Sequence, residues 1–169
     1  MHQVLTVARG VRLVAFIAAA VLLGACARTP GGVGAAGGAS LSINGAAPGT
    51  SQDFVVNVGD RVFFDTDSTN LSATAMATLA KQVMWLQRYP RYVFTIEGHA
   101  DERGTREYNI ALGARRATTV RDYFLAHGIA GNRMHTISYG KERPVAVCND
   151  NSCWAQNRRA VVVLNNAGV

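Results

Sequence analysis

The chain has 169 residues, of which 49% are hydrophobic and 17% are charged, and it carries a formal net charge of +6. This length allows one folded domain with a substantial core and additional segments. A mild positive balance suits an anionic polymer or a membrane surface, and it is equally compatible with ordinary solubility. Basic residues are not interleaved with aromatic ones in a stripe, so we expect no nucleic-acid partner.

The first segment has the pattern of a secretory signal peptide. Arg9 and Arg12 precede an apolar run at 13–23. This run is shorter than the ~20 apolar residues that a bilayer span requires. A basic region followed by a short apolar region therefore predicts a signal peptide over residues 1–25.

The apolar run ends in Leu23-Gly24-Ala25-Cys26, which resembles the lipobox of bacterial lipoproteins. The resemblance implies that Cys26 becomes the first mature residue and carries a diacylglycerol thioether and an N-acyl chain such as palmitate. Several acyl chains on one residue give stable anchoring. Ala27 stands where Asp would resemble an inner-membrane retention signal, so we expect anchoring in the outer membrane of a Gram-negative cell, facing the periplasm. A plain signal peptide with an incidental Cys26 is the alternative.

Residues 26–52 consist largely of Gly, Ala, Ser and Pro, with almost no large apolar side chains. Such a segment buries too little surface to offset the entropy of folding. We predict a flexible tether with a coil span of roughly 25–30 Å. The globular domain is then expected over residues 53–169.

The globular part begins with a β-rich pattern. Residues 54–58 and 61–65 are strand candidates separated by a turn at Gly59-Asp60, and residues 65–70 are polar turn material. A helix follows, with Ser72 as its N-cap and Pro90 beyond its end. Its expected core face consists of Met76, Leu79, Val83 and Leu86.

The remainder alternates between strands and helices. Strands are expected at 92–97, 134–139 and 159–164, and a short helical turn at 154–157. A helix starts near 104–106 and ends at Gly128. Its expected core face consists of Ile110, Ala114, Ala117, Val120 and Phe124. This alternation predicts βαβ units and a sheet with helices on one or both faces.

The joint between the strand at 92–97 and the following helix carries the chemistry. Asn109, Leu112 and Arg116 are spaced i, i+3 and i+7, so they share one helix face. Asp101 lies just before that helix. A carboxylate and a guanidinium on one concave surface can hold the ammonium and the carboxylate of a small zwitterion.

The segments 97–105, 107–113 and 115–117 resemble the signature of the OmpA-like peptidoglycan-binding domain. Supporting matches stand at 64–67, 138–144 and 157–160, and the resemblance covers residues ~61–164. It implies an α/β fold, an α+β sandwich in which a mixed sheet packs against helices. It also implies a binding protein that is not an enzyme and needs no cofactor other than the covalent lipid.

The family's ligand is the meso-diaminopimelate side chain of the peptidoglycan stem peptide. The resemblance implies that Asp101 binds its ammonium and Arg116 its carboxylate. Asp67, with Thr66, would close the site from the first loop, and Leu112 would pack on the methylene stem. A lysine stem peptide lacks the terminal carboxylate and would leave Arg116 without its partner, at a cost of ~1–3 kcal/mol. Replacing Asp101 or Arg116 by Ala is expected to abolish binding to sacculi while the domain stays folded.

The other charged residues near the joint are expected to be supporting. Glu102 and Arg103 should pair with neighbours or support the loop, and Arg115 and Arg121 should lie on a solvated helix face. Arg106 stands where the family often has Pro, which suits a first helical turn. This departure leaves the expected ligand residues untouched.

His99 and two cysteines require separate interpretation. His99 is interpreted as a loop residue, because no Ser or Cys nucleophile stands near it, and His127 and His135 lie on other elements without the spacing of metal ligands. Cys148 and Cys153 are expected to form a disulfide in the oxidising periplasm, stabilising the fold by ~2 kcal/mol. Half of a zinc site is the alternative for this pair.

The combined prediction is an outer-membrane lipoprotein that tethers its membrane non-covalently to peptidoglycan. The resemblance further implies partnership with the Tol system, notably the periplasmic β-propeller TolB. That system draws the outer membrane inward during cell division and maintains envelope integrity. The alternatives are a wall anchor or motor-type stator outside the Tol system, and a periplasmic hydrolase.

Overall fold

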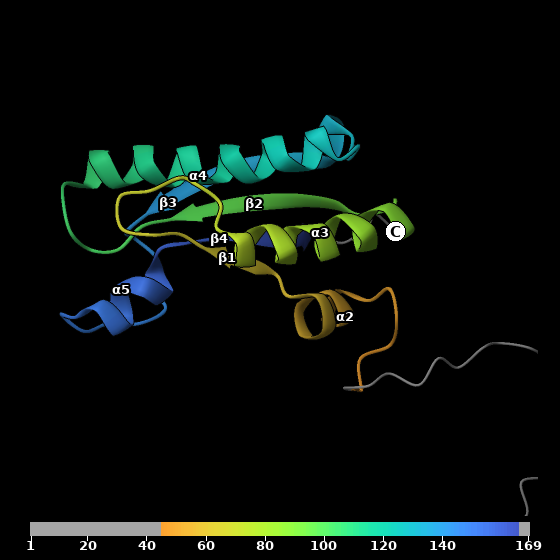
Figure 1. Cartoon of the computed structure of the whole chain (residues 1–169), viewed down its shortest axis with the longest axis horizontal. Coiled ribbons are helices and arrows are strands. Elements are labelled where there is room, and N and C mark those ends of the chain that lie inside the picture. Colours follow the sequence, from red (N-terminus) through yellow and green to blue (C-terminus); the bar gives the residue numbers. More distant parts are fainter. Residues whose placement is uncertain (1–44, 166–169) are drawn as a thin grey trace, which may run out of the picture. The chain divides into compact units, whose positions relative to one another are not determined.

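The structure is a computed structural model that describes residues 45–165. Its centre is a four-stranded sheet in the order β1-β4-β2-β3 (Figure 1). The strands are β1 (Arg61–Phe63), β2 (Val93–His99), β3 (Met134–Gly140) and β4 (Arg159–Asn165). Strands β2 and β3 are parallel, whereas β4 runs antiparallel to both β1 and β2. The prediction of an α/β fold with a mixed sheet is confirmed.

Two long helices, α3 (Ala73–Arg88) and α4 (Arg106–Ala126), pack on the sheet, and α5 (Asn151–Asn157) precedes β4 (Figure 1). One hydrophobic core joins both long helices to the sheet residues Val62, Phe94, Ile96 and Val162. Alternate strand residues such as Phe63, Ile137 and Val163 are exposed. The sheet is therefore covered by the long helices on one face, and its ends position the loops.

The two long helices start and end close to their predicted positions. The side chain of Ser72 accepts a hydrogen bond from Ala75 N at the start of α3. Thr105 does the same for Tyr108 N at the start of α4. Gly128, just past the end of α4, has φ of +82°, which costs Gly little. α5 starts at Asn151, three residues before the predicted helical turn, because the Asp150 side chain caps it.

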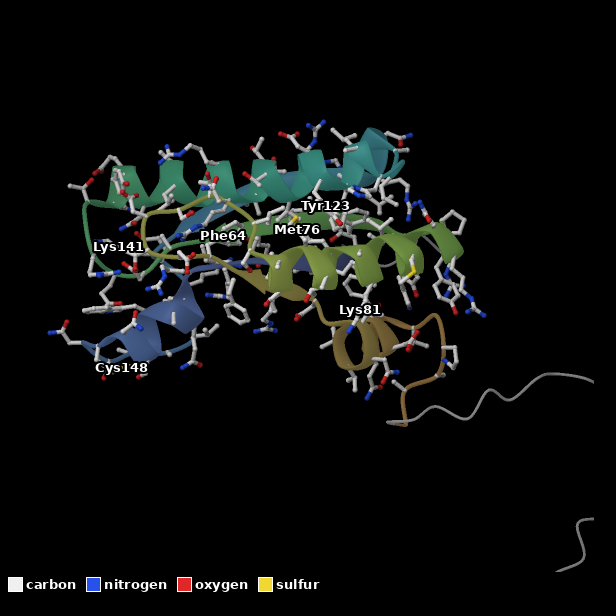
Figure 2. All side chains as sticks on the ribbon, in the orientation of Figure 1. Phe64, Met76, Lys81, Tyr123, Lys141 and Cys148 are labelled. Carbon is white, nitrogen blue, oxygen red and sulfur yellow. A yellow bond between two sulfur atoms is a disulfide. The ribbon has the colours of Figure 1, made fainter. Side chains whose placement is uncertain are left out.

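Each predicted core face contained one wrong residue. Met76 and Ala114 are exposed, and Ala75 and Gly113 are buried in their place. Figure 2 shows Met76 and Tyr123 side by side where α3 and α4 meet, and the Tyr123 hydroxyl donates to the Met76 carbonyl at 3.4 Å. Periodicity identifies a helical stripe to within about one residue, since adjacent positions differ by only 100° around the axis.

The prediction of a strand at 54–58 was wrong. The chain forms a short helix, α2 (Ser51–Asp53), continued by the π-helical turn η2 (Phe54–Val58). The Asp53 carboxylate accepts from Trp85 Nε1 at 2.8 Å, and the Phe54 ring lies 4.9 Å from the Trp85 ring. Packing against α3 thus outweighs the strand propensity of the valines, which is a preference for half-buried pleated surfaces.

The folded part also begins earlier than predicted. Residues 45–52 were assigned to the tether, yet Ala46 is buried and the carbonyl of Gly49 accepts from the Tyr92 hydroxyl at 2.7 Å. The signal peptide, Cys26 and the tether up to residue 44 lie outside the described residues, as do residues 166–169. Within residues 45–165, no helix has the length and hydropathy of a membrane span.

Two glycines let α4 approach β2 closely. A Cβ on Gly98 would lie 1.8 Å from the carbonyl oxygen of Gly113, and a Cβ on Gly113 would lie 2.4 Å from Ser138 Oγ. Any larger residue at either position would push the helix off the strand. This contact sets the distance between the end of β2 and the first turns of α4, where the candidate site lies.

Candidate functional site

A cleft of about 360 Å³ lies where the loop after β1, the end of β2 and the start of α4 meet. All six residues predicted to bind the ligand line it. Arg103 lines it too, although we expected it to be only supporting, and Gly104 and Tyr108 were not predicted. The complete lining is Thr66, Asp67, Asp101, Arg103, Gly104, Tyr108, Asn109, Leu112 and Arg116.

Asp101 supplies a buried carboxylate to the cleft. Arg103 pairs with it at 2.6 Å between Nη2 and Oδ2, and Arg158 Nη1 lies 3.4 Å from the same oxygen. Burial by itself raises the pKa of Asp101, but the hydrogen bonds from these two arginines outweigh it and hold the pKa below 3.8. The carboxylate is therefore charged at neutral pH.

Arg116 is fully buried, with 0% of its surface exposed. Its Nε donates to Ser68 O at 2.9 Å, Nη1 to His99 O at 2.7 Å and Nη2 to Asp65 O at 3.1 Å. Burial and the nearby Arg158 lower its pKa to about 10, so it stays protonated at neutral pH. The guanidinium fastens the loop after β1 to the end of β2, and these bonds use three of its five N–H groups.

The loop after β1 forms one wall of the cleft. Asp67 has a φ of +52°, a left-handed conformation that Asp tolerates better than most residues. The Tyr108 hydroxyl donates to Asp67 Oδ1, which ties this loop to α4. Thr66 Oγ1 lies 3.5 Å from Arg103 Nη2. The predicted loop residues thus reach the cleft through contacts that span more than thirty-five positions of the sequence.

Helix α4 contributes to the cleft one residue that holds the preceding loop and one apolar side chain. Asn109 is buried, and its Nδ2 donates to the carbonyl of Arg103 at 2.7 Å. Leu112 is also buried and lines the cleft without a polar group. Asn109 therefore holds the loop in place, whereas Leu112 can pack against methylene groups.

Sequence reasoning missed two residues behind Asp101. Arg158 is buried and also donates from Nε to the carbonyl of Phe64 at 3.1 Å. The Trp154 ring lies under the Arg103 guanidinium at 4.1 Å, and its Nε1 donates to Glu102 Oε1. The sequence did contain a signal for Arg158, since Arg158 and Arg159 directly precede the apolar residues of a strand. Charged side chains are rarely buried unless they have partners, so this pattern indicates that the arginines bind buried acceptors.

His99 is not a loop residue, contrary to the prediction. It is the last residue of β2, 1% exposed, and its ring lies 5.6 Å from that of Tyr139. Burial, with Arg159 and Arg143 nearby, lowers its pKa to about 4, so the imidazole is neutral at pH 7. In the described part of the chain, no cluster of three or more His, Cys, Asp or Glu residues could hold a metal ion.

The remaining charged residues lie outside the cleft lining. Arg106 pairs with Glu142 at 3.0 Å, and Arg121 lies 3.9 Å from Asp122. Arg115 is exposed on α4. Lys141, at the same end of the molecule in Figure 2 as the disulfide loop, donates to the carbonyl oxygens of Glu102 and Gly104 and supports the loop before α4.

Cys148 and Cys153 form a disulfide, with their Cα atoms 5.7 Å apart. It joins the loop before α5 to the helix itself, and α5 carries Trp154. The disulfide is therefore adjacent in the chain to Trp154, which contacts Arg103 and Glu102.

The sequence profile of the OmpA family matches residues 63–159. The chain belongs to the OmpA family. A protein named "Peptidoglycan-associated lipoprotein" from Rhizobium meliloti (strain 1021) is 60% identical over 163 residues, covering 96% of this chain and 92% of the relative. One of the same name from Brucella melitensis biotype 1 is 55% identical over 168 residues and covers 99% of both chains.

Solved structures agree with this membership of the OmpA family. The crystal structure of the peptidoglycan-associated lipoprotein from Burkholderia pseudomallei matches with a TM-score of 0.61 and 42% identity, covering 63% of this chain and 90% of that one. The C-terminal domain of Helicobacter pylori MotB matches with a TM-score of 0.59 at 21% identity, which shows a shared fold alone. The predicted resemblance to OmpA-like peptidoglycan-associated lipoproteins is thus confirmed, and their name describes association with peptidoglycan.

Proposed function

We propose that this protein binds peptidoglycan through the cleft, and that the recognised group is the zwitterionic free end of diaminopimelate in the stem peptide. The observation that carries the proposal is that a negatively charged carboxylate and a positively charged guanidinium line one small cleft. Asp101 and Arg116 come from different elements and line the same cleft. The names of the relatives described above, which state association with peptidoglycan, support it.

Each group has a chemical role in this proposal. The Asp101 carboxylate binds the ammonium, and the two N–H groups of Arg116 that face no carbonyl bind the ligand carboxylate. Leu112 packs on the methylene stem. A cleft of about 360 Å³ lies at the small end of the ~300–1,000 Å³ range of ligand pockets, so it suits an amino-acid end and not a glycan strand. No metal or cofactor takes part.

The location of the protein is part of the proposal. Lipidation of Cys26 would anchor the chain in the outer membrane, with the domain facing the periplasm. The same protein would then hold the membrane by its lipid and the wall by its cleft. We further propose that it acts in the Tol-Pal system, with TolB as a partner, during outer-membrane invagination in cell division and in maintaining envelope integrity.

Binding to purified sacculi tests the site. Asp101→Asn keeps the shape of the side chain and removes its charge, so it should abolish pull-down of the domain by sacculi that contain diaminopimelate. The matched control is Asp122→Asn, which removes an exposed carboxylate from α4 outside the cleft. Circular dichroism establishes that both variants are folded. Undiminished binding by Asp101→Asn would show that the site assignment is wrong.

Two further measurements test the ligand and the anchor. Sacculi whose stem peptides carry lysine should bind more weakly, because Arg116 loses its carboxylate partner at a cost of ~1–3 kcal/mol. In cells, labelled palmitate should be incorporated into the wild-type protein and not into Cys26→Ala. Pull-down with purified TolB tests the Tol-Pal partnership separately.

A further inference from the structure

The Asp101 carboxylate has no free acceptor position in the unliganded protein. Oδ1 accepts from the backbone N of Arg103 at 3.2 Å and from its Nε at 3.1 Å. Oδ2 accepts from Arg103 Nη2 at 2.6 Å and from Arg158 Nη1 at 3.4 Å. A carboxylate offers about four lone-pair sites, so an incoming ammonium must displace a partner.

The two arginines that hold Asp101 differ in how firmly they are bound. The Arg158 side chain is only 8% exposed and also donates to the Phe64 carbonyl and to Asn151. The Arg103 side chain is 41% exposed. Arg103 is therefore the partner that can leave Asp101 at low cost, since exposed charges are readily solvated and exposed ion pairs contribute little.

Arg103 also has contacts that do not depend on Asp101. The Arg103 guanidinium lies 4.1 Å above the Trp154 ring, and aromatic faces attract cations. Thr66 Oγ1 lies 3.5 Å from Nη2. Arg103 can thus give up the carboxylate and keep its stacking contact at the rim of the cleft.

We propose that Arg103 is a displaceable counter-ion of Asp101, whose guanidinium occupies the position that the ammonium of the ligand takes. Binding then exchanges one cation for another on the same carboxylate. This inference rests on the proposed function, because it assumes that the ligand's ammonium binds Asp101. It makes Arg103 a specificity-determining residue, since a ligand without an ammonium leaves the Arg103–Asp101 pair closed and loses that interaction.

Calorimetric titration of the domain with meso-diaminopimelate tests the exchange. Arg103→Gln removes the competing cation, so diaminopimelate should bind ~1.5- to 5-fold more tightly than to wild type, the range expected for a part-exposed ion pair. Pimelate, which has the same carbon chain and carboxylates but no ammonium, should gain nothing. Binding of diaminopimelate to Arg103→Gln should also depend more strongly on salt concentration. In this variant the ligand forms a new ion pair with Asp101, whereas in wild type it replaces the existing pair between Arg103 and Asp101.

Two variants serve as controls. Arg106→Gln removes an equal charge three residues further on, from a side chain that pairs with Glu142 outside the cleft, and it should bind as wild type does. Arg103→Lys keeps a competing cation without the guanidinium fork that contacts both oxygens of Asp101, so its affinity for diaminopimelate should lie between those of wild type and Arg103→Gln. Thermal unfolding checks that each variant is folded.

The outcomes separate this inference from the proposed function. If wild type binds and Asp101→Asn does not, but Arg103→Gln binds diaminopimelate no more tightly than wild type, then the counter-ion role is wrong and the peptidoglycan site stands. If wild type does not bind sacculi or diaminopimelate at all, the proposed function itself fails. If Arg106→Gln increased the affinity for diaminopimelate as much as Arg103→Gln does, the effect would be due to net charge and the inference would be overturned.

Discussion

Replacing Arg116 by Met should destabilise the fold and not only impair binding. Met has a similar length and no charge, so it fills much of the same space. It leaves the carbonyl oxygens of Asp65, Ser68 and His99 without their donors in a buried region. The loop after β1 is then no longer joined to the end of β2 through this side chain, because Arg116 donates to two carbonyl oxygens of the loop and to one at the end of the strand.

The magnitude follows from the three hydrogen bonds, which measure 2.7 to 3.1 Å. A hydrogen bond to a charged group contributes ~1.5–3 kcal/mol, and contributions within one network are not additive. The buried guanidinium also has a desolvation cost, visible in the lowering of its pKa to about 10, which the variant no longer carries. We expect a net loss of ~3–5 kcal/mol, the range for removing one partner of a buried charged interaction.

Urea denaturation followed by circular dichroism measures this loss, with Arg115→Met as the control. Arg115 is the exposed neighbour on the same helix, so its replacement should change the free energy of unfolding by less than about 0.5 kcal/mol. A domain of this size should also unfold at least ~10 °C lower after the Arg116 change. Equal urea midpoints for Arg116→Met and wild type would refute the structural role of this guanidinium, and binding loss could then be assigned to the ligand contact alone.

Three other changes have defined outcomes. Gly98→Ala places a Cβ 1.8 Å from the Gly113 carbonyl oxygen and should cost about 3 kcal/mol or more in urea denaturation; an unchanged midpoint would contradict the close packing of α4 on β2. Replacing Cys148 and Cys153 by Ser should cost ~2 kcal/mol, and reductant should lower the melting temperature of wild type but not of the double variant. His99 has a folded pKa of about 4 against 6.5 when unfolded, so the unfolded chain binds the extra proton and stability should fall as pH drops from 6.5 to 4, by about 3 kcal/mol in all. His99→Phe should flatten that part of the pH profile, and a profile equal to that of wild type would show that His99 is not its source.

The local signals in the sequence were reliable for different physical reasons. Ser72 caps its helix as expected, and α4 starts within the predicted range 104–106, because helix starts depend on residues a few positions apart. The strand at 54–58 was predicted wrongly because its residues have strand propensity, whereas the contact of Phe54 with Trp85 spans thirty-one positions and favours a helix. Long-range packing of this kind leaves no periodic trace in the sequence.

The candidate site divides in the same way. The sequence by itself determined which six side chains belong together, since the spacing of Asn109, Leu112 and Arg116 defines one helix face and the family resemblance adds Asp101 and the first loop. Only the tertiary structure decided that Arg116 is fully buried and donates three hydrogen bonds to backbone carbonyls up to 51 positions away. It alone also decided that Arg103 and Arg158 fill the acceptor positions of Asp101. The physical reason is that residue types and spacing specify which groups can bind a zwitterion, whereas their free hydrogen-bonding capacity depends on partners that folding brings from distant parts of the chain.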